Sequence, residues 1–472
     1  MKRIIGWVIP CFFTSLHVGA SEACSDVRAQ EVVSCYVKAA QQEPLDHVLR
    51  AQESDAGYEW RHYRMTSQTW QPAPVVKPAR WRHSVEMHIP PGALPEKALL
   101  VVNNGVRFGP EQSPDYSREV LREISLLTRT VVVMITDVPN QALSFSDLDV
   151  PVKEDEAVAH TWAHWMSDEA APAELPLHVP MAVAASRAMD LAVQALPDLR
   201  VERFIVTGAS KRGWSAWLTA LSDERVVAIV PAVIDVADTS SMLAGLRKRY
   251  GGEWPLALWR YQAAGVLPQL GTPAFDRLMQ LMDPMQYLEE PGRRLDIPKY
   301  LVSASGDDFF SPDPVTNYLA RLPGQTSLRV LPNSDHYGVR AHVATTLVPL
   351  VQRIQAGRDL PALQVAAAGE GGLVEVRASE LPAAVRLWTA ANPDDRDFRY
   401  ACGVRFASQT LQVRNQAFSL QLPSVASGWQ AWFVEARFAD GFVATSPVSV
   451  LPETFPAHPP KAVGEACKTF PG

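Results

Sequence analysis

Between residues 97 and 350 the chain alternates short apolar runs with amphipathic segments, and this alternation constrains the fold more than any other feature. The apolar runs span residues 98–102, 130–135, 204–207, 226–234, 300–304 and 328–331. Helical patterns separate several of them, at residues 117–127, 181–196 and 214–221. Continuous apolar strands separated by helices are typical of a parallel sheet buried on both faces. We therefore predict an α/β fold with a mostly parallel sheet, preceded by an antiparallel strand at residues 81–89.

The remainder of the chain departs from this rhythm in two places. Residues 238–296 are rich in Trp, Tyr, Leu and Arg, and we expect them to form a helical insertion above the sheet. From about residue 365, short strands with polar turns replace the helices, which predicts a small C-terminal β-sandwich. The predicted organisation is a signal peptide at 1–20, an N-terminal segment packed on the core at 21–80, the α/β domain at 81–358, the sandwich at 365–455 and a tail at 456–472.

The first twenty residues have the pattern of an export signal. Lys2 and Arg3 precede a mostly apolar stretch at residues 4–16, and residues 18–20 offer the small side chains that a signal peptidase recognises. That stretch is too short to cross a bilayer comfortably, and no later apolar run reaches 18 residues. We therefore expect an exported protein, periplasmic or secreted, with no integral membrane segment once the signal is removed.

Export changes how the cysteines are interpreted. Once the leader is removed, Cys24, Cys35, Cys402 and Cys467 remain, and in an oxidising compartment they favour two disulfides. Three connectivities are possible, including a bridge between the two ends of the chain. The spacing matches no zinc-ribbon pattern, so no metal is expected. The formal net charge of -7 makes a nucleic acid a poor partner.

Residues 203–214 are predicted to form a strand, a tight turn and a helix. Ser210 lies in the turn, where a strand–turn–helix geometry would expose its hydroxyl at the carboxyl edge of the sheet. Gly208 supplies the small residue that such a turn requires. The usual second glycine would stand at 212, but this chain has Arg212 there and Gly213 next. We predict Ser210 as a nucleophile of the α/β-hydrolase type, the alternative being a serine in an ordinary turn.

A serine nucleophile needs a base and an orienting carboxylate, which follow it in the order Asp or Glu, then His, in this type of sheet. His336 follows the last core strand and is the predicted base. Asp308 is the leading candidate for the carboxylate because of its spacing from the next proline. Asp307 is the second candidate, and Asp235, after the preceding strand, is the third.

The other predicted site residues surround this trio. The loop at residues 101–105, which we take to follow the third strand of the sheet, contains Asn104, whose amide we expect to form an oxyanion hole with the amide of Lys211. Trp254 and Trp259 of the insertion are candidates for a substrate pocket. His160 and His164 have the spacing of a helical metal pair but no evident third ligand, so we expect a structural role. The chain has no phosphate loop or dinucleotide fingerprint, and we expect no cofactor.

Several stretches of the chain together resemble a known family. They are Trp81-Arg82-His83, residues 99–105, 206–217, 231–235 and 306–313, Pro332-Asn333 with His336, and residues 385–390 with 396–399. These residues resemble the bacterial PhoPQ-activated pathogenicity-related proteins. The resemblance implies an exported, virulence-related protein with an α/β-hydrolase-like domain and a β-rich C-terminal domain, but no settled substrate. The turn at Ser210 is also similar to that of glucuronoyl esterases, and by this analogy Lys211 would add a charge at the oxyanion.

The leading hypothesis is therefore an exported serine hydrolase with an α/β-hydrolase-like fold, acting on an ester, a peptide or a glycan-linked small molecule. Ser210, His336 and Asp308 would form its triad. The alternative is an inactive hydrolase-fold protein that binds peptides, carbohydrates or proteins, since a fold does not dictate a function.

Overall fold

The computed structural model describes residue 24 and residues 26–72, 74–107, 113–289, 294–366, 372–424 and 427–472. The predicted signal peptide lies outside the described residues. No described helix combines the length and the apolar composition needed to cross a bilayer.

A nine-stranded sheet runs through the described part of the molecule in the order β1-β2-β4-β6-β5-β8-β9-β11-β12. Its strands are β1 (Asp46–Asp55), β2 (Tyr58–Thr69), β4 (Arg80–Ile89), β5 (Lys97–Val102), β6 (Val131–Ile135), β8 (Arg203–Ala209), β9 (Val226–Ala232), β11 (Lys299–Ala304) and β12 (Thr326–Leu331). The six strands from β6 to β12 are parallel, whereas β1, β2 and β4 are antiparallel. This confirms the predicted parallel sheet and the antiparallel strand before it, and the fold is α/β-hydrolase-like.

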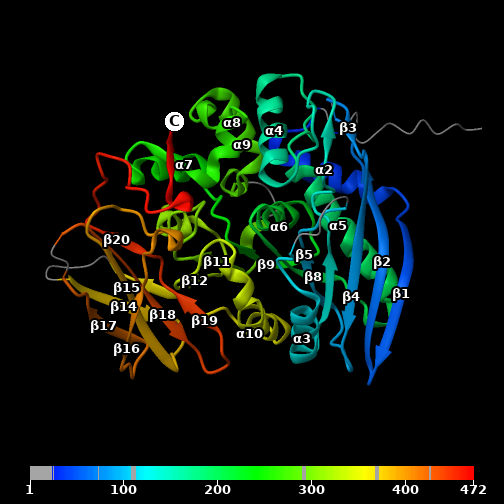
Figure 1. The fold of residues 1–472 in the computed structure, drawn as a ribbon. Helices are drawn as coiled ribbons and strands as arrows, with labels where there is room; N and C mark the ends of the chain where they lie inside the picture. Colours follow the sequence, from blue (N-terminus) through cyan, green and yellow to red (C-terminus); the bar gives the residue numbers. More distant parts are fainter. Residues whose placement is uncertain are drawn as a thin grey trace, which may run out of the picture.

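Helices cover both faces of this sheet because its central strands are apolar on both sides. Successive side chains of a strand point to opposite faces. In β5, Leu99 and Val101 pack in one core, whereas Leu100 and Val102 pack in the other. The first core lies under α3 (Arg118–Thr128) and α10 (Val343–Gln355), and the second under α2 (Ala29–Gln42), α5 (His178–Ala195) and α6 (Lys211–Ser222) (Figure 1).

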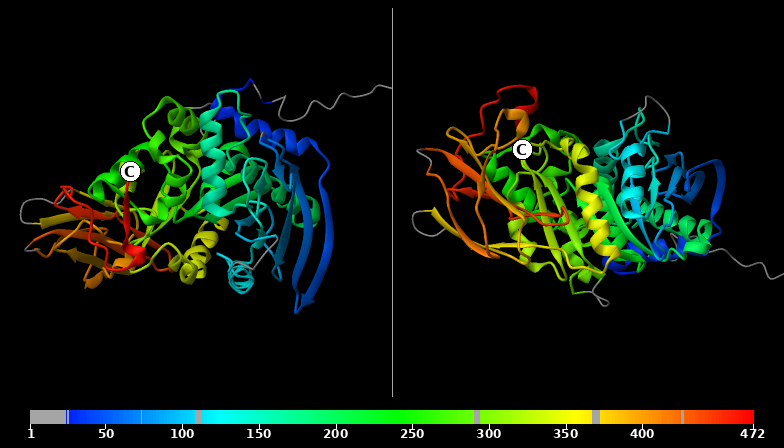
Figure 2. Two further views of the ribbon diagram at one scale, coloured as in Figure 1. Left: turned by 45° about the horizontal axis from the view of Figure 1, so that its top comes forward. Right: turned by 90° about the horizontal axis from the view of Figure 1, so that it is seen from below.

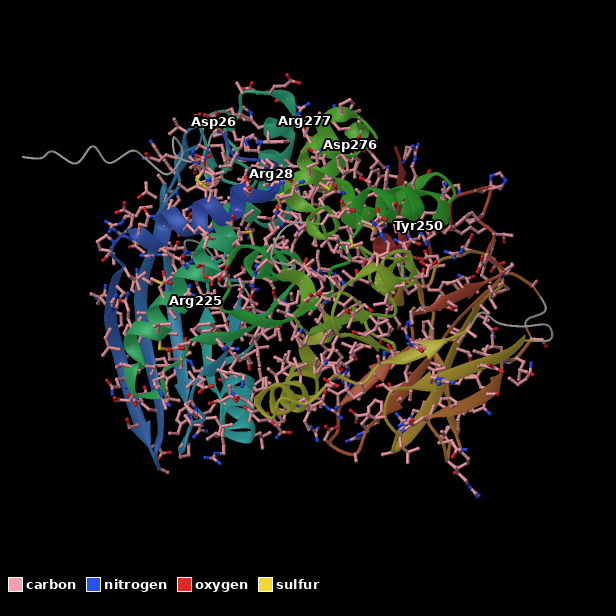
Figure 3. The ribbon with its side chains drawn as sticks, turned by 180° about the vertical axis from the view of Figure 1, so that it is seen from behind. Asp26, Arg28, Arg225, Tyr250, Asp276 and Arg277 are labelled. Carbon is pink, nitrogen blue, oxygen red and sulfur yellow. A yellow bond between two sulfur atoms is a disulfide. The ribbon has the colours of Figure 1, made fainter. Side chains whose placement is uncertain are left out.

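The N-terminal segment is part of the α/β domain. β1 and β2 extend the main sheet, so the sheet begins well before residue 81. A separate two-stranded sheet is formed by β3 (Val76–Lys77) and β7 (Ser144–Phe145). Helix α2 packs against α5, α6 and α9 (Pro273–Met282). Figure 3 shows the start of α2, at Arg28, on the same side of the molecule as Asp276 and Arg277 of α9.

The insertion contains α7 (Thr239–Arg249), β10 (Glu253–Pro255), α8 (Trp259–Ala263) and α9. A fourth helix, α4 (Glu154–Ser167), comes from the segment after β7 and packs on α8 and α9. Figure 1 shows these four helices together on one side of the sheet. Three of them, α4, α7 and α8, contribute residues to the lining of the site described below.

The C-terminal region consists of two antiparallel sheets. The first contains β13 (Leu363–Val365), β14 (Leu373–Ala378) and β17 (Ala417–Gln421); the second contains β16 (Ala407–Leu411), β15 (Ala384–Asn392), β18 (Trp429–Arg437), β19 (Val443–Thr445) and β20 (Ser449–Leu451). Buried residues of both sheets, among them Val374, Leu420 and Val434, share one core. This β domain and strand β1 lie at opposite ends of the molecule (Figures 1 and 2).

The disulfides join neighbouring segments. Cys24 bonds Cys35 in the middle of α2, and Cys402 bonds Cys467 in the C-terminal region. Neither bridge ties one end of the chain to the other. The tail instead returns to the insertion, where β21 (Thr469–Pro471) pairs with β10.

Candidate active site

Ser210 occupies the sharp turn between β8 and α6. It is the N-cap of α6, with φ of 56° and ψ of -128°, and its amide donates to the Ala232 carbonyl of β9 at 2.8 Å. A positive φ is uncommon for a residue other than glycine and marks a strained backbone. A strained strand–turn–helix of this kind exposes the nucleophile in hydrolases of this fold.

Close packing on both sides of the turn explains the displaced glycine. A Cβ at Gly208 would lie 2.5 Å from the Arg212 carbonyl oxygen, and a Cβ at Gly213 would lie 2.9 Å from the Gly208 oxygen and 2.7 Å from Ile234 Cγ2. The Arg212 side chain leads away from the turn, because its Nε donates to the Val138 carbonyl at 2.6 Å. Arginine is therefore accommodated at 212, and glycine is required at 213.

Gly213→Ala should destabilise the fold by about 1–3 kcal/mol, because the added methyl group overpacks the turn against Gly208 of β8 and the Ile234 side chain. Urea denaturation of the purified variant measures this change. Gly464→Ala is the matched control, since a Cβ there meets nothing within 4 Å. A Gly213→Ala variant as stable as the parent protein would contradict the packing explanation.

Asp307 and His336 form a buried pair. The loops after β11 and β12 bring them together, and His336 Nδ1 lies 2.9 Å from Asp307 Oδ2. Asp307 Oδ1 accepts hydrogen bonds from the amides of Phe309, at 2.7 Å, and Phe310, at 3.2 Å. Burial lowers the pKa of His336, but the charge and hydrogen bond of Asp307 outweigh it, so the net pKa is raised. With its proton held on Nδ1, the imidazole offers Nε2 as a base.

The structure brings Asp307, not Asp308, to His336. The hydrogen bonds from the Phe309 and Phe310 amides fix the direction of the Asp307 carboxylate. The side chain of Asp308 makes no contact of this kind with His336. Asp308 Oδ1 is buried without a hydrogen-bond partner among the described residues, and burial with the charge of Asp307 raises its pKa to about 6. The role expected for Asp308 therefore does not match the geometry.

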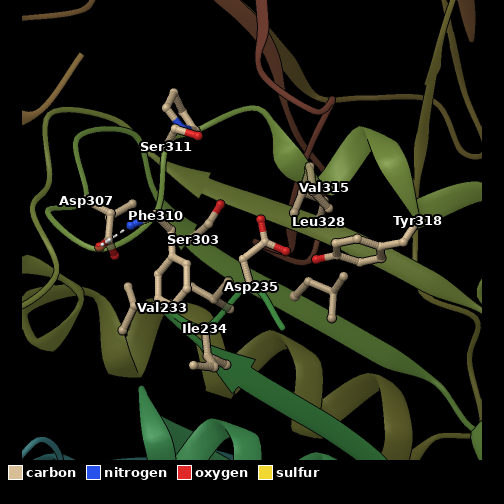
Figure 4. A pocket seen from close by; sticks show the side chains of 14 residues that line it. Val233, Ile234, Asp235, Ser303, Asp307, Phe310, Ser311, Val315, Tyr318 and Leu328 are labelled. Atoms are coloured by element: carbon tan, nitrogen blue, oxygen red, sulfur yellow. Dashed lines mark hydrogen bonds between the residues drawn. The ribbon is translucent and has the colours of Figure 1, made fainter. Parts of the chain in front are cut away.

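Asp235, the third candidate, lies in a pocket behind the pair. Figure 4 shows its carboxylate pointing toward the Tyr318 hydroxyl, with Phe310 between it and Asp307. Burial raises the pKa of Asp235 to about 7. No hydrogen bond joins Asp235 to His336 in the described part of the chain, so the structure does not assemble it with the pair.

The two residues expected at the oxyanion hole differ in position. Lys211 is the first residue of α6, where helix amides have no acceptor within the helix. The Asn104 amide instead donates to Asn103 Oδ1 at 3.0 Å, and the Asn104 side chain bonds Ser113 and Asp115. Asn104 therefore orders its own loop, and it does not line a pocket with Ser210.

The Lys211 side chain is buried in an ion-pair network. Its Nζ lies 2.8 Å from Glu154 and 3.4 Å from Asp155, both at the start of α4. Burial lowers the pKa of Lys211, but the two carboxylates reverse this and the net pKa is raised. Glu154 also pairs with Arg212 at 2.6 Å. The ammonium expected to help the oxyanion thus already has two carboxylate partners.

Ser210 lies where two pockets meet. The polar pocket also contains His336, Arg340 and Asp115. The apolar pocket also contains Trp162 and Trp214, with further aliphatic and aromatic side chains. Sequence reasoning missed both tryptophans, although Trp214 stands four residues after Ser210 and so lies one helical turn further along.

Trp254 and Trp259 line neither of these pockets. Trp254 is buried where β10 pairs with Phe470 of the tail, and Trp259 is half exposed with its ring 5.3 Å from that of Phe470. Both tryptophans therefore pack against the C-terminal tail.

The described residues contain no group of three His, Cys, Asp or Glu side chains suited to a metal ion. His160 lies 3.3 Å from Asp147, and its ring stacks on that of His164 at 6.3 Å. Both histidines belong to α4 itself, where they lie one helical turn apart.

Comparison with known proteins places the chain in a family. A relative, autocrine proliferation repressor protein A of Dictyostelium discoideum, is 28% identical over 435 residues, which cover 83% of this chain and 85% of the relative. Among solved structures, an acetyl xylan esterase from Paenibacillus sp. R4 has 14% identity and a TM-score of 0.47, covering 72% of this chain and 98% of that one. A glucuronoyl esterase from Solibacter usitatus has 14% identity and a TM-score of 0.34, covering 66% and 86%.

The family profile of PhoPQ-activated pathogenicity-related proteins matches residues 33–399. The match spans the whole α/β domain from α2 onward and the first strands of the β domain, and it confirms the resemblance seen in the sequence. The chain therefore belongs to the PhoPQ-activated pathogenicity-related protein family.

Proposed function

We propose that this protein is an exported serine hydrolase that cleaves a carboxylic ester or a peptide bond. The hydrogen-bonded pair of His336 and Asp307 beside Ser210, on the strained turn after β8, carries this proposal. Export is supported by the two disulfides, which form and persist in oxidising compartments.

The chemistry follows from the placement of these groups. Ser210 attacks the substrate carbonyl while His336 Nε2 takes its proton, and Asp307 holds the imidazole in the required tautomer and stabilises its charged form. The Lys211 amide, at the start of α6, is positioned to donate to the oxyanion. His336 then gives the proton to the leaving group, and water releases the acyl group by the reverse sequence.

The alternative function is a binding module without catalysis. Its support in the sequence is the glycine displaced from 212 to 213 and a C-terminal β domain rich in Trp. Because packing of Gly208 against Gly213 accounts for that displacement, the feature no longer counts against a catalytic serine.

A substrate panel separates the two functions. The purified protein is incubated with p-nitrophenyl esters and with peptide p-nitroanilides, and release of the chromophore is followed. Saturable turnover of one class supports the hydrolase. Binding of peptides or glycans with no turnover of either class would favour the binding module.

A further inference from the structure

We infer that the substrate is an ester of an apolar acid with a polar, hydroxyl-bearing alcohol, with the acyl chain in the apolar pocket and the alcohol in the polar pocket. The inference rests on the proposed function and names its substrate class. Two observations support it: one pocket is apolar and the other polar, and only the polar pocket contains His336.

The apolar pocket lies between α4, α6, α7 and the loop after β11, and apolar side chains make up most of its lining. Its wall includes Trp162, Trp214, Leu243, Val266 and Phe310. An acyl chain that enters it loses contact with water along its whole length, which favours binding for each methylene buried.

Three polar groups of this pocket already have partners, whereas Trp162 Nε1 has none among the described residues. The Tyr261 hydroxyl donates to Asp155 at 3.1 Å, and Lys211 lies 3.4 Å from the same carboxylate. Because these three groups pair with one another, an apolar chain can cover them without leaving any of them without a partner.

The position of His336 sets the direction of the substrate. Ser210 lines both pockets, whereas His336 lines only the polar one. Ser210 Oγ bonds the carbonyl carbon, the bond from that carbon to the alcohol oxygen breaks, and this oxygen takes the serine proton through His336. The alcohol must therefore lie within reach of His336, in the polar pocket, and the acyl chain extends into the other.

The polar pocket suits an alcohol with several hydroxyl groups. Arg340 donates to Asp115 at 2.7 Å, and Glu154 and Tyr337 lie in the same wall. A hydroxyl group can donate to the charged acceptors of this site and accept from its charged donors. An alkyl group offers no hydrogen bonds and is disfavoured there.

A chain-length series tests this inference. With p-nitrophenol as a constant leaving group, kcat/KM should rise about fourfold for each methylene added to acetate until the pocket is full. Leu243→Phe should shorten the preferred chain and Leu243→Ala should lengthen it. Leu246→Ala, a buried residue on α7 outside the pocket, is the control and should leave the preference unchanged.

The outcomes separate the inference from the function on which it rests. Hydrolysis that peaks at acetate, or a preference that Leu243 variants do not move, overturns the inference and leaves the hydrolase in place. Turnover of peptide p-nitroanilides with no ester also overturns the inference, and hydrolysis of neither class overturns the proposed function. An octanoyl ester of glucose should be cleaved faster than octyl octanoate, and the reverse order would contradict the assignment of the polar pocket.

A second inference rests on other contacts, those between the β domain and the loops that carry Asp307 and His336. Next to Asp307, the Gly306 carbonyl accepts a hydrogen bond from the Tyr400 amide at 3.0 Å. In the His336 loop, Asn333 Nδ2 donates to the Phe406 carbonyl at 2.9 Å, and its Oδ1 accepts from the Phe406 amide at 2.7 Å.

The same segment of the β domain makes a third contact. Arg396 pairs with Asp313, at the end of the Asp307 loop, at 2.8 Å, and Asp313 also pairs with Arg249 of the insertion. Within this segment, Cys402 is bonded to Cys467. The geometry points to residues 396–406 as a positioning element that holds Asp307 and His336 together.

Asn333→Gly tests the positioning element, because glycine keeps the left-handed φ of 54° at this position and removes both side-chain hydrogen bonds. We expect kcat to fall about tenfold to hundredfold with little change in KM, since a small misplacement is enough. The acid limb of the pH profile should also move to lower pH as the pair loosens. The charged or titratable groups around His336 are Asp307, Asp308, Asp335, Tyr337, Lys211, Asp155 and Arg340, and Asp115, Glu154 and Arg212 line the same pocket.

Thr445→Val is the control for stability. It removes the hydrogen bond from the Val330 amide, at 3.0 Å, elsewhere in the junction between the β domain and the sheet. It should lower the free energy of unfolding without moving the pH profile. If Asn333→Gly behaves like Thr445→Val, with an unchanged pH profile, residues 396–406 have only a structural role.

Discussion

Replacing Ser210 with alanine is expected to lower kcat/KM for ester hydrolysis by about 10⁴-fold or more, because the variant has no atom that can form the acyl intermediate. Alanine has the same Cβ as serine, so it meets the strained φ of 56° with no new backbone cost. The free energy of unfolding should therefore stay close to that of the parent protein. Initial rates on the preferred ester and urea denaturation together measure both quantities.

A second serine on the same helix provides the control for this variant. Ser215 is buried, and its hydroxyl donates to the Lys211 carbonyl at 3.1 Å. Ser215→Ala should keep the activity of the parent protein. Ser210→Ala with activity close to that of the parent would show that the hydrolysis occurs at another site.

Asp307→Asn is expected to lower kcat by about 10³- to 10⁴-fold, because the amide can no longer fix the histidine tautomer or stabilise the imidazolium. The adjacent Asp308→Asn is the matched control and should leave kcat/KM at the parent level. Rates of the two variants on one ester, measured side by side, distinguish the two carboxylates. Loss of activity in Asp308→Asn alone would restore Asp308 as the orienting acid.

The pH dependence of kcat/KM is a second measurement that compares the parent protein with Asp307→Asn. Only neutral His336 can take the serine proton, so activity rises as pH increases through its pKa. Since that pKa is raised above its ordinary value of 6.5, the acid limb of kcat/KM should lie above pH 6.5. In Asp307→Asn the residual activity should have its acid limb at lower pH, because the charge that raises the pKa is gone.

The core of the fold could be predicted from the sequence because its strands are buried on both faces. β5 and β6 are continuous apolar runs, and runs of this kind have few alternatives to a parallel sheet. β1 (Asp46–Asp55) is exposed at nearly every position and pairs on one side only, so it has no apolar periodicity by which it could be recognised. The sheet therefore begins earlier in the chain than residue 81, where the sequence pattern predicted its first strand.

The candidate site could be predicted to the level of loops but not of side-chain directions. Ser210 and His336 each follow a core strand, and the carboxyl ends of parallel strands meet at one edge. The choice between Asp307 and Asp308 depends on hydrogen bonds from the Phe309 and Phe310 amides, which are properties of the folded loop.

The substrate pocket was misjudged for a related reason. Trp254 and Trp259 belong to the insertion, but pairing of β10 with β21 at the far end of the chain turns them toward the tail. A contact so distant in sequence leaves no local pattern. The tryptophans of the pocket come from α4 and α6, where a core residue and a pocket residue have the same signature.

The central claim, a nucleophilic serine at 210, is tested most directly by covalent labelling. The purified protein is treated with a fluorophosphonate, digested, and analysed by peptide mass spectrometry, with Ser210→Ala and Asp307→Asn treated in parallel. The account predicts one modified peptide, with the adduct on Ser210, fast labelling of the parent protein, slow labelling of Asp307→Asn and none of Ser210→Ala. An adduct on another serine, or no adduct in a protein that hydrolyses esters, would contradict it.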